Sequence, residues 1–221
     1  MNFTENLTRS YNENASPEKA GPMENYMKNN FPFYGIKTEL RRSLHKAAVE
    51  DHKEEVKSNA REIALDLYSK KEREYHYSAI EILMKELKKK FVKEDIGLIE
   101  KLLVTHSWWD SVDTISKYLL GGYLQQFPEA TYSVIDRFSA SDNMWLNRAA
   151  IIFQLGYKND TNAALLFSEC ERHRHSKEFF IQKAIGWALR EYGKTDAEAV
   201  KKFVARANLK PLSNREALKN L

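Results

Sequence analysis

The chain has 221 residues, of which 43% are hydrophobic and 30% are charged, and its formal net charge is +4. This composition predicts one soluble domain or a short repeat array, and the chain is too short for two domains of typical size. Apolar runs stay below the roughly 18 residues of a membrane span. The N-terminus MNFTENLTRS lacks the layout of a secretory signal, so we expect a cytoplasmic protein without membrane contact.

Residues that commonly hold metals are sparse. Cys170 is the only cysteine, which rules out an internal disulfide and a thiolate cluster, and its helical surroundings predict burial. His173 and His175 lie in the basic stretch ERHRHSK and are interpreted as solvated or phosphate-facing. We expect no metal site and no cofactor.

Helical spacing of apolar residues recurs along the chain, and no segment alternates as strands do. Ser16 before Pro17 predicts a helix start, and Thr38 opens another helix. Further helices are predicted to begin near residues 61, 72, 94, 108, 129, 143, 161, 177, 196 and 213.

These starts form two interleaved series, each with a spacing of about 35 residues, as in an α-solenoid. The tetratricopeptide motif is absent, which favours a HEAT-like repeat. We therefore predict an all-α protein, a single HEAT-like domain over residues 1–221, with N-terminal helices in about 1–60 and repeats in about 61–221. The second helix of each pair should line a concave, basic face.

Three charged residues recur in equivalent places on the predicted second helices: Asp113, Arg148 and Lys183. Their separations are equal, since 148 − 113 = 35 and 183 − 148 = 35. Trp109 and Trp187 each lie four residues from a charged neighbour, which places each pair on one helical face. The lining face should gather two indoles, one carboxylate and two cations.

A structural interpretation competes with this one. A lone tryptophan at helical spacing is more often core than active site, and an aspartate one repeat before an arginine is often only an inter-helix ion pair. Adjacent helical residues point about 100° apart, so we expect Trp108 to face inward and Trp109 outward. Trp145 is interpreted as core.

Basic residues are concentrated toward the C-terminus. Residues 201–221 carry six cations against Glu216 alone, a balance of about +5 that suits phosphates. Arg190, three residues beyond Trp187, extends the basic side of the lining face.

Three long motifs make the sequence similar to a known family: SWWDSVD (107–113), SDNMWLNRAAIIFQL (141–155) and HSKEFFIQKAIGWALREY (175–192). They closely resemble the AlkD family of bacterial alkylpurine DNA glycosylases. The resemblance continues through residues 16–38 and 209–219, so it covers nearly the whole chain. The chain ends soon after its last predicted helix, which leaves room for a short further tail.

The resemblance implies an enzyme that binds alkylated double-stranded DNA and hydrolyses the N-glycosidic bond of 3-methyladenine and 7-methylguanine. It implies Asp113 as catalytic carboxylate, Trp109 and Trp187 as aromatic walls beside the lesion, Arg148 as a DNA-backbone contact and Tyr26 as part of the DNA-binding surface. Family members work without flipping the base, unlike most glycosylases.

Further expectations complete this picture. Lys183, Arg190 and the helix start at Thr38 should contact phosphates. We expect a monofunctional, monomeric enzyme without lyase activity, acting at the bacterial nucleoid. Two alternatives stay open: a catalytically silent DNA-binding scaffold or damage sensor of the same family, and a peptide-binding helical-repeat adaptor.

Overall fold

The computed structural model describes residues 1–220 and contains helices, turns and loops but no strand within that range. The chain divides into two compact units, Met1–Lys90 and Phe91–Leu221, which are described separately. None of the helices in residues 1–220 is long and apolar enough to cross a membrane.

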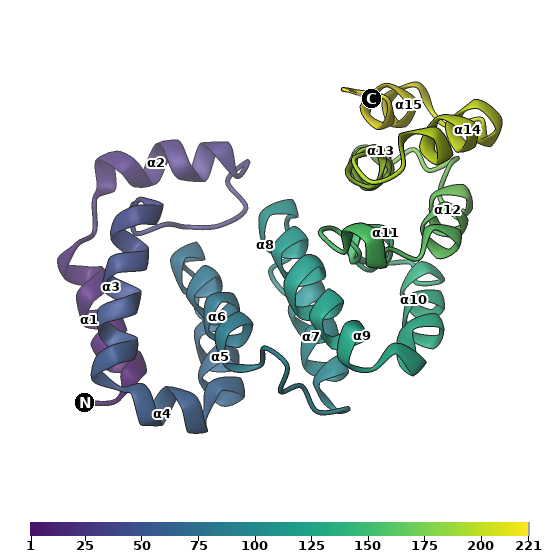
Figure 1. The fold of residues 1–221 in the computed structure, drawn as a ribbon. Helices are drawn as coiled ribbons and strands as arrows, with labels where there is room; N and C mark the ends of the chain where they lie inside the picture. Colours follow the sequence, from purple (N-terminus) through teal and green to yellow (C-terminus); the bar gives the residue numbers. More distant parts are fainter. Residues whose placement is uncertain (221) are drawn as a thin grey trace. The chain divides into compact units, whose positions relative to one another are not determined.

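The first unit is built from helices α1 to α6, in which α1 packs on α3, α5 packs on α6, and α3 also contacts α6 (Figure 1). The bounds of these helices are α1 Phe3–Glu13, α2 Pro17–Tyr26, α3 Thr38–Asp51, α4 Lys53–Ser58, α5 Ala60–Tyr68 and α6 Arg73–Glu86.

Helix α1 has a strong local signal that the sequence interpretation passed over. The Asn2 side chain accepts a hydrogen bond from the Glu5 amide, and the Glu5 carboxylate accepts one from the Asn2 amide. This reciprocal capping box satisfies two amides at the helix start. The pattern Asn-x-x-Glu at residues 2–5 could have predicted the helix.

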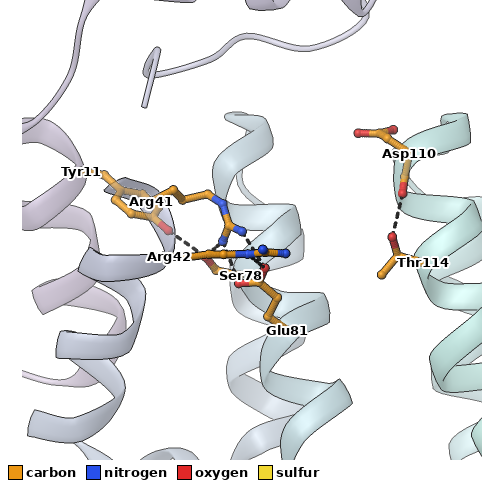
Figure 2. Close-up of polar contacts among 7 residues, drawn as sticks. All are labelled: Tyr11, Arg41, Arg42, Ser78, Glu81, Asp110 and Thr114. Carbon is orange, nitrogen blue, oxygen red and sulfur yellow. Dashed lines mark hydrogen bonds and ion pairs between the residues drawn. The ribbon is translucent and has the colours of Figure 1, made fainter. Parts of the chain in front are cut away.

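Buried polar contacts join the helices of this unit. Arg41 on α3 donates to both carboxylate oxygens of Glu81 on α6, at 2.6 and 2.9 Å, and Arg42 donates to the same carboxylate (Figure 2). The Glu74 carboxylate accepts from the amides of residues 34, 35 and 36. Glu74 thereby fixes the loop that leads into α3.

The second unit continues with the two-helix pattern. Its elements are α7 Asp95–Val104, α8 Trp109–Thr114, the π-helix η1 Ile115–Leu120, α9 Gly121–Gln126, the 3₁₀ turn η2 Pro128–Ala130, α10 Thr131–Ser139, α11 Met144–Ile152, the 3₁₀ turn η3 Lys158–Asp160, α12 Ala163–Arg172, α13 Phe179–Gly193, α14 Ala197–Ala207 and α15 Pro211–Ala217.

Two layers run through this unit. The second helices contact one another in series, α8 with α11, α11 with α13 and α13 with α15. The first helices α10, α12 and α14 form the other layer, each packed on the second helix that follows it (Figure 1). One apolar cluster that includes Ile152, Cys170, Ile185 and Phe203 fills the space between α11 and α15.

The all-α fold, an α-solenoid of two-helix repeats, is therefore as predicted. Every repeat helix from α5 to α15 that the sequence predicted begins within two residues of its expected start. Helix α2 begins at Pro17 and α3 at Thr38, as expected. Cys170 is fully buried, as predicted. The single-domain organisation and the concave shape of the lining face stay predictions.

Candidate active site

Asp113 lies near the end of α8, where the helix changes its hydrogen-bonding pattern. Two hydroxyls nearby bond back to the carbonyl four residues earlier: Thr114 donates to Asp110 at 3.0 Å (Figure 2), and Ser116 donates to Val112 at 2.6 Å. Such back-bonding competes with the regular helix ladder, and the π-helix η1 follows at residue 115. Short π-helical segments are frequent at functional sites.

The Asp113 carboxylate forms a two-pronged ion pair with Arg148 on α11. Nε of Arg148 lies 2.7 Å from one oxygen and Nη2 lies 2.9 Å from the other. Nη1 donates to the carbonyl of Phe180 at the start of α13. Arg148 as a whole is 4% exposed, so one buried arginine connects the second helices of three consecutive repeats.

Burial and the ion pair act in opposite directions on Asp113. Burial is the largest influence and leaves the pKa of Asp113 above its ordinary value. The hydrogen bonds and charge of Arg148 lower this pKa, and the Asp110 charge raises it. Arginine is always protonated in proteins and matches both carboxylate oxygens. The guanidinium therefore favours the carboxylate form of Asp113 against the effect of burial, and it fixes the orientation of the two oxygens.

Three aromatic rings pack together at the start of α8, α11 and α13. The ring of Trp108 lies 5.8 Å from that of Trp145 and 5.2 Å from that of Phe180, and the last two are 5.1 Å apart. The inward packing of Trp108 and Trp145 agrees with the sequence interpretation, although both keep part of their surface exposed. This cluster joins the starts of α8 and α11, the helices that carry Asp113 and Arg148.

The two proposed wall residues occupy different positions in the unit. Trp109 is the first residue of α8, one turn before Asp113, and is half-buried. Trp187 lies in the middle of α13 and packs partly against the apolar cluster. Their contact with a lesion stays a prediction.

The two cations on α13 share one acidic partner. Lys183 Nζ lies 3.0 Å from one Glu216 oxygen, and Arg190 Nη1 lies 2.8 Å from the other. These contacts lower the pKa of Glu216 to about 2, chiefly through the hydrogen bond from Lys183. The structure thus brings Asp113 together with Arg148, and Lys183 together with Arg190.

The remaining two candidates belong to the first unit. Tyr26 is the last residue of α2 and is 67% exposed. Thr38 is the exposed first residue of α3. Both side chains are accessible at helix ends, and their contacts with DNA stay predictions.

One interpretation is wrong. His173 neither faces solvent nor is placed to meet a phosphate, because its side chain is 12% exposed. Its Nε2 lies 3.1 Å from the Ser139 hydroxyl, and Ser139 in turn bonds to Glu169. Burial lowers the pKa of His173 to about 4. His175, by contrast, is exposed.

Two residues of the site were not identified from the sequence. Phe180 supplies a ring to the aromatic cluster and a carbonyl that accepts a hydrogen bond from Arg148. The two consecutive phenylalanines at the start of this predicted helix could have drawn attention to it. Glu216 was seen only as the lone acid in a basic segment. Across residues 1–220, no group of three or more His, Cys, Asp or Glu residues is arranged to hold a metal.

The comparisons with known proteins identify the family. The family model described as DNA alkylation repair enzyme matches residues 7–221. The chain belongs to the DNA alkylation repair enzyme family. A solved structure titled "Predicted DNA alkylation repair enzyme from Enterococcus faecalis" is 33% identical, with a TM-score of 0.85 over 94% of this chain and 96% of that one. No curated protein matches.

Membership of the DNA alkylation repair enzyme family supports an enzyme that acts in the repair of alkylated DNA, and it makes DNA the partner. The resemblance read from the three sequence motifs is confirmed at this level. The buried Asp113–Arg148 pair is the arrangement of charged residues on which the proposal below is based.

Proposed function

We propose that the protein is a monofunctional DNA glycosylase that hydrolyses the N-glycosidic bond of cationic N3- and N7-alkylpurines in duplex DNA. The substrates would include 3-methyladenine and 7-methylguanine, and the products would be the free base and an abasic site. The observation that carries the proposal is the Asp113 carboxylate, held by two hydrogen bonds from the buried Arg148.

The chemistry of the lesion explains why so few groups could suffice. A purine alkylated at N3 or N7 is already positively charged and leaves as a neutral base, so it needs no general acid. What develops is a sugar with oxocarbenium character, as in glycoside hydrolysis. A carboxylate beside C1′ stabilises that cation and orients the attacking water.

The environment of Asp113 fits this role. Its hydrogen bonds from Arg148 favour the ionised form, and its partial burial reduces the screening of its charge by water. The fixed orientation means that little reorganisation is needed as positive charge appears on the sugar. A lone surface carboxylate would have neither property.

Aromatic walls would supply the rest of the site. The faces of Trp109 and Trp187 would attract both the cationic lesion and the cationic transition state, by ~0.5–1 kcal/mol when exposed and ~2 or more when desolvated. Because this recognition works on charge, we propose that the base is not drawn into an enclosed pocket.

DNA affinity would come from cations on phosphates, with little sequence preference. Arg148, Lys183 and Arg190 would supply these cations in the second unit. In the first unit, Tyr26 and Thr38 would add contacts with the DNA backbone that carry no charge. Arg148 would have a second use beside holding Asp113. Nε and Nη2 donate to Asp113 and Nη1 donates to Phe180, so a phosphate would have to be met through the small part of the side chain that stays exposed. We propose a monomer without cofactor, acting on DNA in the bacterial cytoplasm.

The proposal is tested with a duplex that contains a single 7-methylguanine. Enzyme in excess is incubated with the duplex, and alkali then cleaves the strand at abasic sites. We expect cleavage at the lesion and none in the matched unmodified duplex. A lesion strand that binds and stays intact would instead support the silent scaffold.

A further inference from the structure

The helix α15 meets α13 at a point where a glycine permits unusually close packing. A Cβ atom on Gly186 would lie 2.4 Å from Cβ of Glu216 and 3.0 Å from the Ser213 carbonyl oxygen. The Ser213 hydroxyl also donates to the Gln182 carbonyl at 3.0 Å. Only a residue without a Cβ lets Glu216 reach this position.

Glu216 lies across the glycine from both cations of α13. Lys183, Gly186 and Arg190 occupy positions i, i+3 and i+7 of the helix, so they share one face. Oε1 of Glu216 accepts from Lys183 on one side, and Oε2 accepts from Arg190 on the other. Arg190 Nη1 also donates to the Glu216 backbone carbonyl at 3.2 Å.

This arrangement leaves donors for a further anion. Both contacts of Arg190 use Nη1, and Lys183 uses one of the three donors of its ammonium group. Lys183 and Arg190 are 38% and 26% exposed at their side chains, against 15% for Glu216. The side chains of Lys183 and Arg190 are therefore more accessible to solvent than the Glu216 carboxylate that they bind.

Trp187 shares this part of α13, because it follows Gly186 directly and lies four residues after Lys183. A phosphate held by the two cations would thus lie beside the proposed aromatic wall. The three residues would act together only if the long side chains of Lys183 and Arg190 are held in place.

We propose that Glu216 is a positioning residue that aligns Lys183 and Arg190 to bind one DNA phosphate next to Trp187. This inference rests on the proposed function and deepens it. Free lysine and arginine side chains lose rotamer freedom when they bind, and Glu216 removes that freedom before DNA arrives.

The proposal predicts that removing Glu216 lowers DNA affinity, whereas simple electrostatic repulsion predicts that it raises DNA affinity. Removing an acid from a DNA-binding face should tighten binding, because phosphates are negative. Removing a positioning acid should weaken binding, because the two cations lose their shared anchor. The screened repulsion from one carboxylate is small at physiological salt, so positioning should dominate.

The test measures binding of a fluorescent, undamaged duplex at several salt concentrations for wild type, Glu216→Ala, Glu216→Asp, Glu216→Gln and Lys183→Ala. We expect Glu216→Ala to weaken binding by ~5-fold and to lower the salt slope by about one phosphate contact, and we expect the same of Lys183→Ala. Combining the two substitutions should add little. Glu216→Asp and Glu216→Gln should retain part of the affinity, since both still accept hydrogen bonds.

Glu198→Ala is the matched control, because it removes an equal charge from a surface pair with Lys201 on α14. It should leave binding unchanged or tighten it slightly. Equal or tighter binding by Glu216→Ala, with an unchanged melting temperature, would overturn the proposal. Because the duplex is undamaged, this result is independent of whether wild type releases 7-methylguanine, which decides the proposed function.

Discussion

Both helical layers of the second unit carry ion pairs between residues about one repeat apart, yet these pairs differ in their surroundings. In the layer of first helices, Arg172 bonds to Asp136, 36 residues earlier, and the side chains are 37% and 76% exposed. In the layer of second helices, Arg148 bonds to Asp113, 35 residues earlier, and the side chains are 5% and 16% exposed.

Repeat spacing therefore does not by itself mark a functional pair. A stack of similar two-helix units brings equivalent positions together in every layer, and opposite charges at those positions pair wherever they occur. What separates Asp113–Arg148 is burial, two-pronged geometry and the link to the Phe180 carbonyl on a third helix. A surface pair contributes little to stability, whereas a buried pair must be complete to be tolerated.

The largest expected difference between the two pairs lies in catalysis. Replacing Asp113 with Asn should slow base release by about 100-fold or more, a scale typical of losing a charge-stabilising group. DNA affinity should be unchanged or slightly higher, because the carboxylate repels phosphates. Single-turnover excision and duplex binding would be measured side by side.

Asp136→Asn is the matched control, since it alters the exposed pair in the same way. It should leave excision at the wild-type rate. If Asp113→Asn also released 7-methylguanine at that rate, the buried pair would be structural only.

Loss of the arginine should affect the two ion pairs differently, both in the free energy of unfolding and in the pH dependence of excision. Replacing Arg148 with Ala leaves Asp113 buried and unpaired, which should cost about 3 kcal/mol of unfolding free energy, against about 0–1 for Arg172→Ala. The substitution also removes the influences that lower the pKa of Asp113, while burial and Asp110 continue to raise it.

Catalysis needs the ionised form, so excision is lost as pH falls through the pKa of Asp113. The acid limb of the excision profile should therefore move to higher pH in Arg148→Ala, and DNA binding should weaken. An unchanged profile, with unchanged salt dependence of binding, would show that Arg148 neither orients Asp113 nor contacts DNA.

The aromatic residues should have intermediate effects. Trp109→Ala and Trp187→Ala should each cost ~0.5–2 kcal/mol at the transition state, or a few-fold to ~30-fold in excision rate. Replacement by Phe should restore part of the rate, because a ring face is kept. The excision rate of each variant would be measured on 7-methylguanine duplexes. A variant that unfolds more easily but excises at the wild-type rate when folded would show that the ring serves only packing.

The smallest effect on excision is expected from the buried network of the first-helix layer, which should influence stability alone. Burial holds His173 neutral in the folded protein, with a pKa of about 4, while the unfolded chain takes up the proton near pH 6.5. Stability is therefore full above pH 6.5 and falls as pH drops toward 4, by roughly 2 kcal/mol at pH 5 from this residue.

His173→Gln should reduce that acid sensitivity, because the amide can still bond to Ser139 without titrating. Denaturant unfolding at pH 7 and pH 5 measures it, and the excision profile should not move. An acid sensitivity equal to that of wild type would mean that other groups, such as the half-buried His45, control it.

The sequence was most informative where local signals and repeat spacing agree. Helix starts followed from caps and prolines. The equal places of Asp113 and Arg148 in successive repeats put both on one face, and their contact was considered only as the competing structural interpretation. Family motifs then gave those two residues a chemical role that spacing alone could not.

Other features depend on tertiary packing and could not be predicted. Predicting the close approach at Gly186 would require knowledge of which face of α13 packs on α15. The contacts of Glu216 with Lys183 and Arg190 could therefore not be predicted from the sequence. His173 looked solvated among charged neighbours, yet the fold turns it toward Ser139. The π-helix after Asp113 has no simple sequence signature.

The central claim is that the site acts on the charge of the lesion and needs no general acid or enclosing pocket. The most direct measurement compares excision from matched duplexes that carry a bulky cationic N-alkylpurine or a small neutral lesion such as uracil or hypoxanthine. We expect release of the bulky cationic base, far faster than of either neutral base. Fast release of a neutral base, with none of the bulky cationic one, would contradict the account and indicate a selective pocket with acid catalysis.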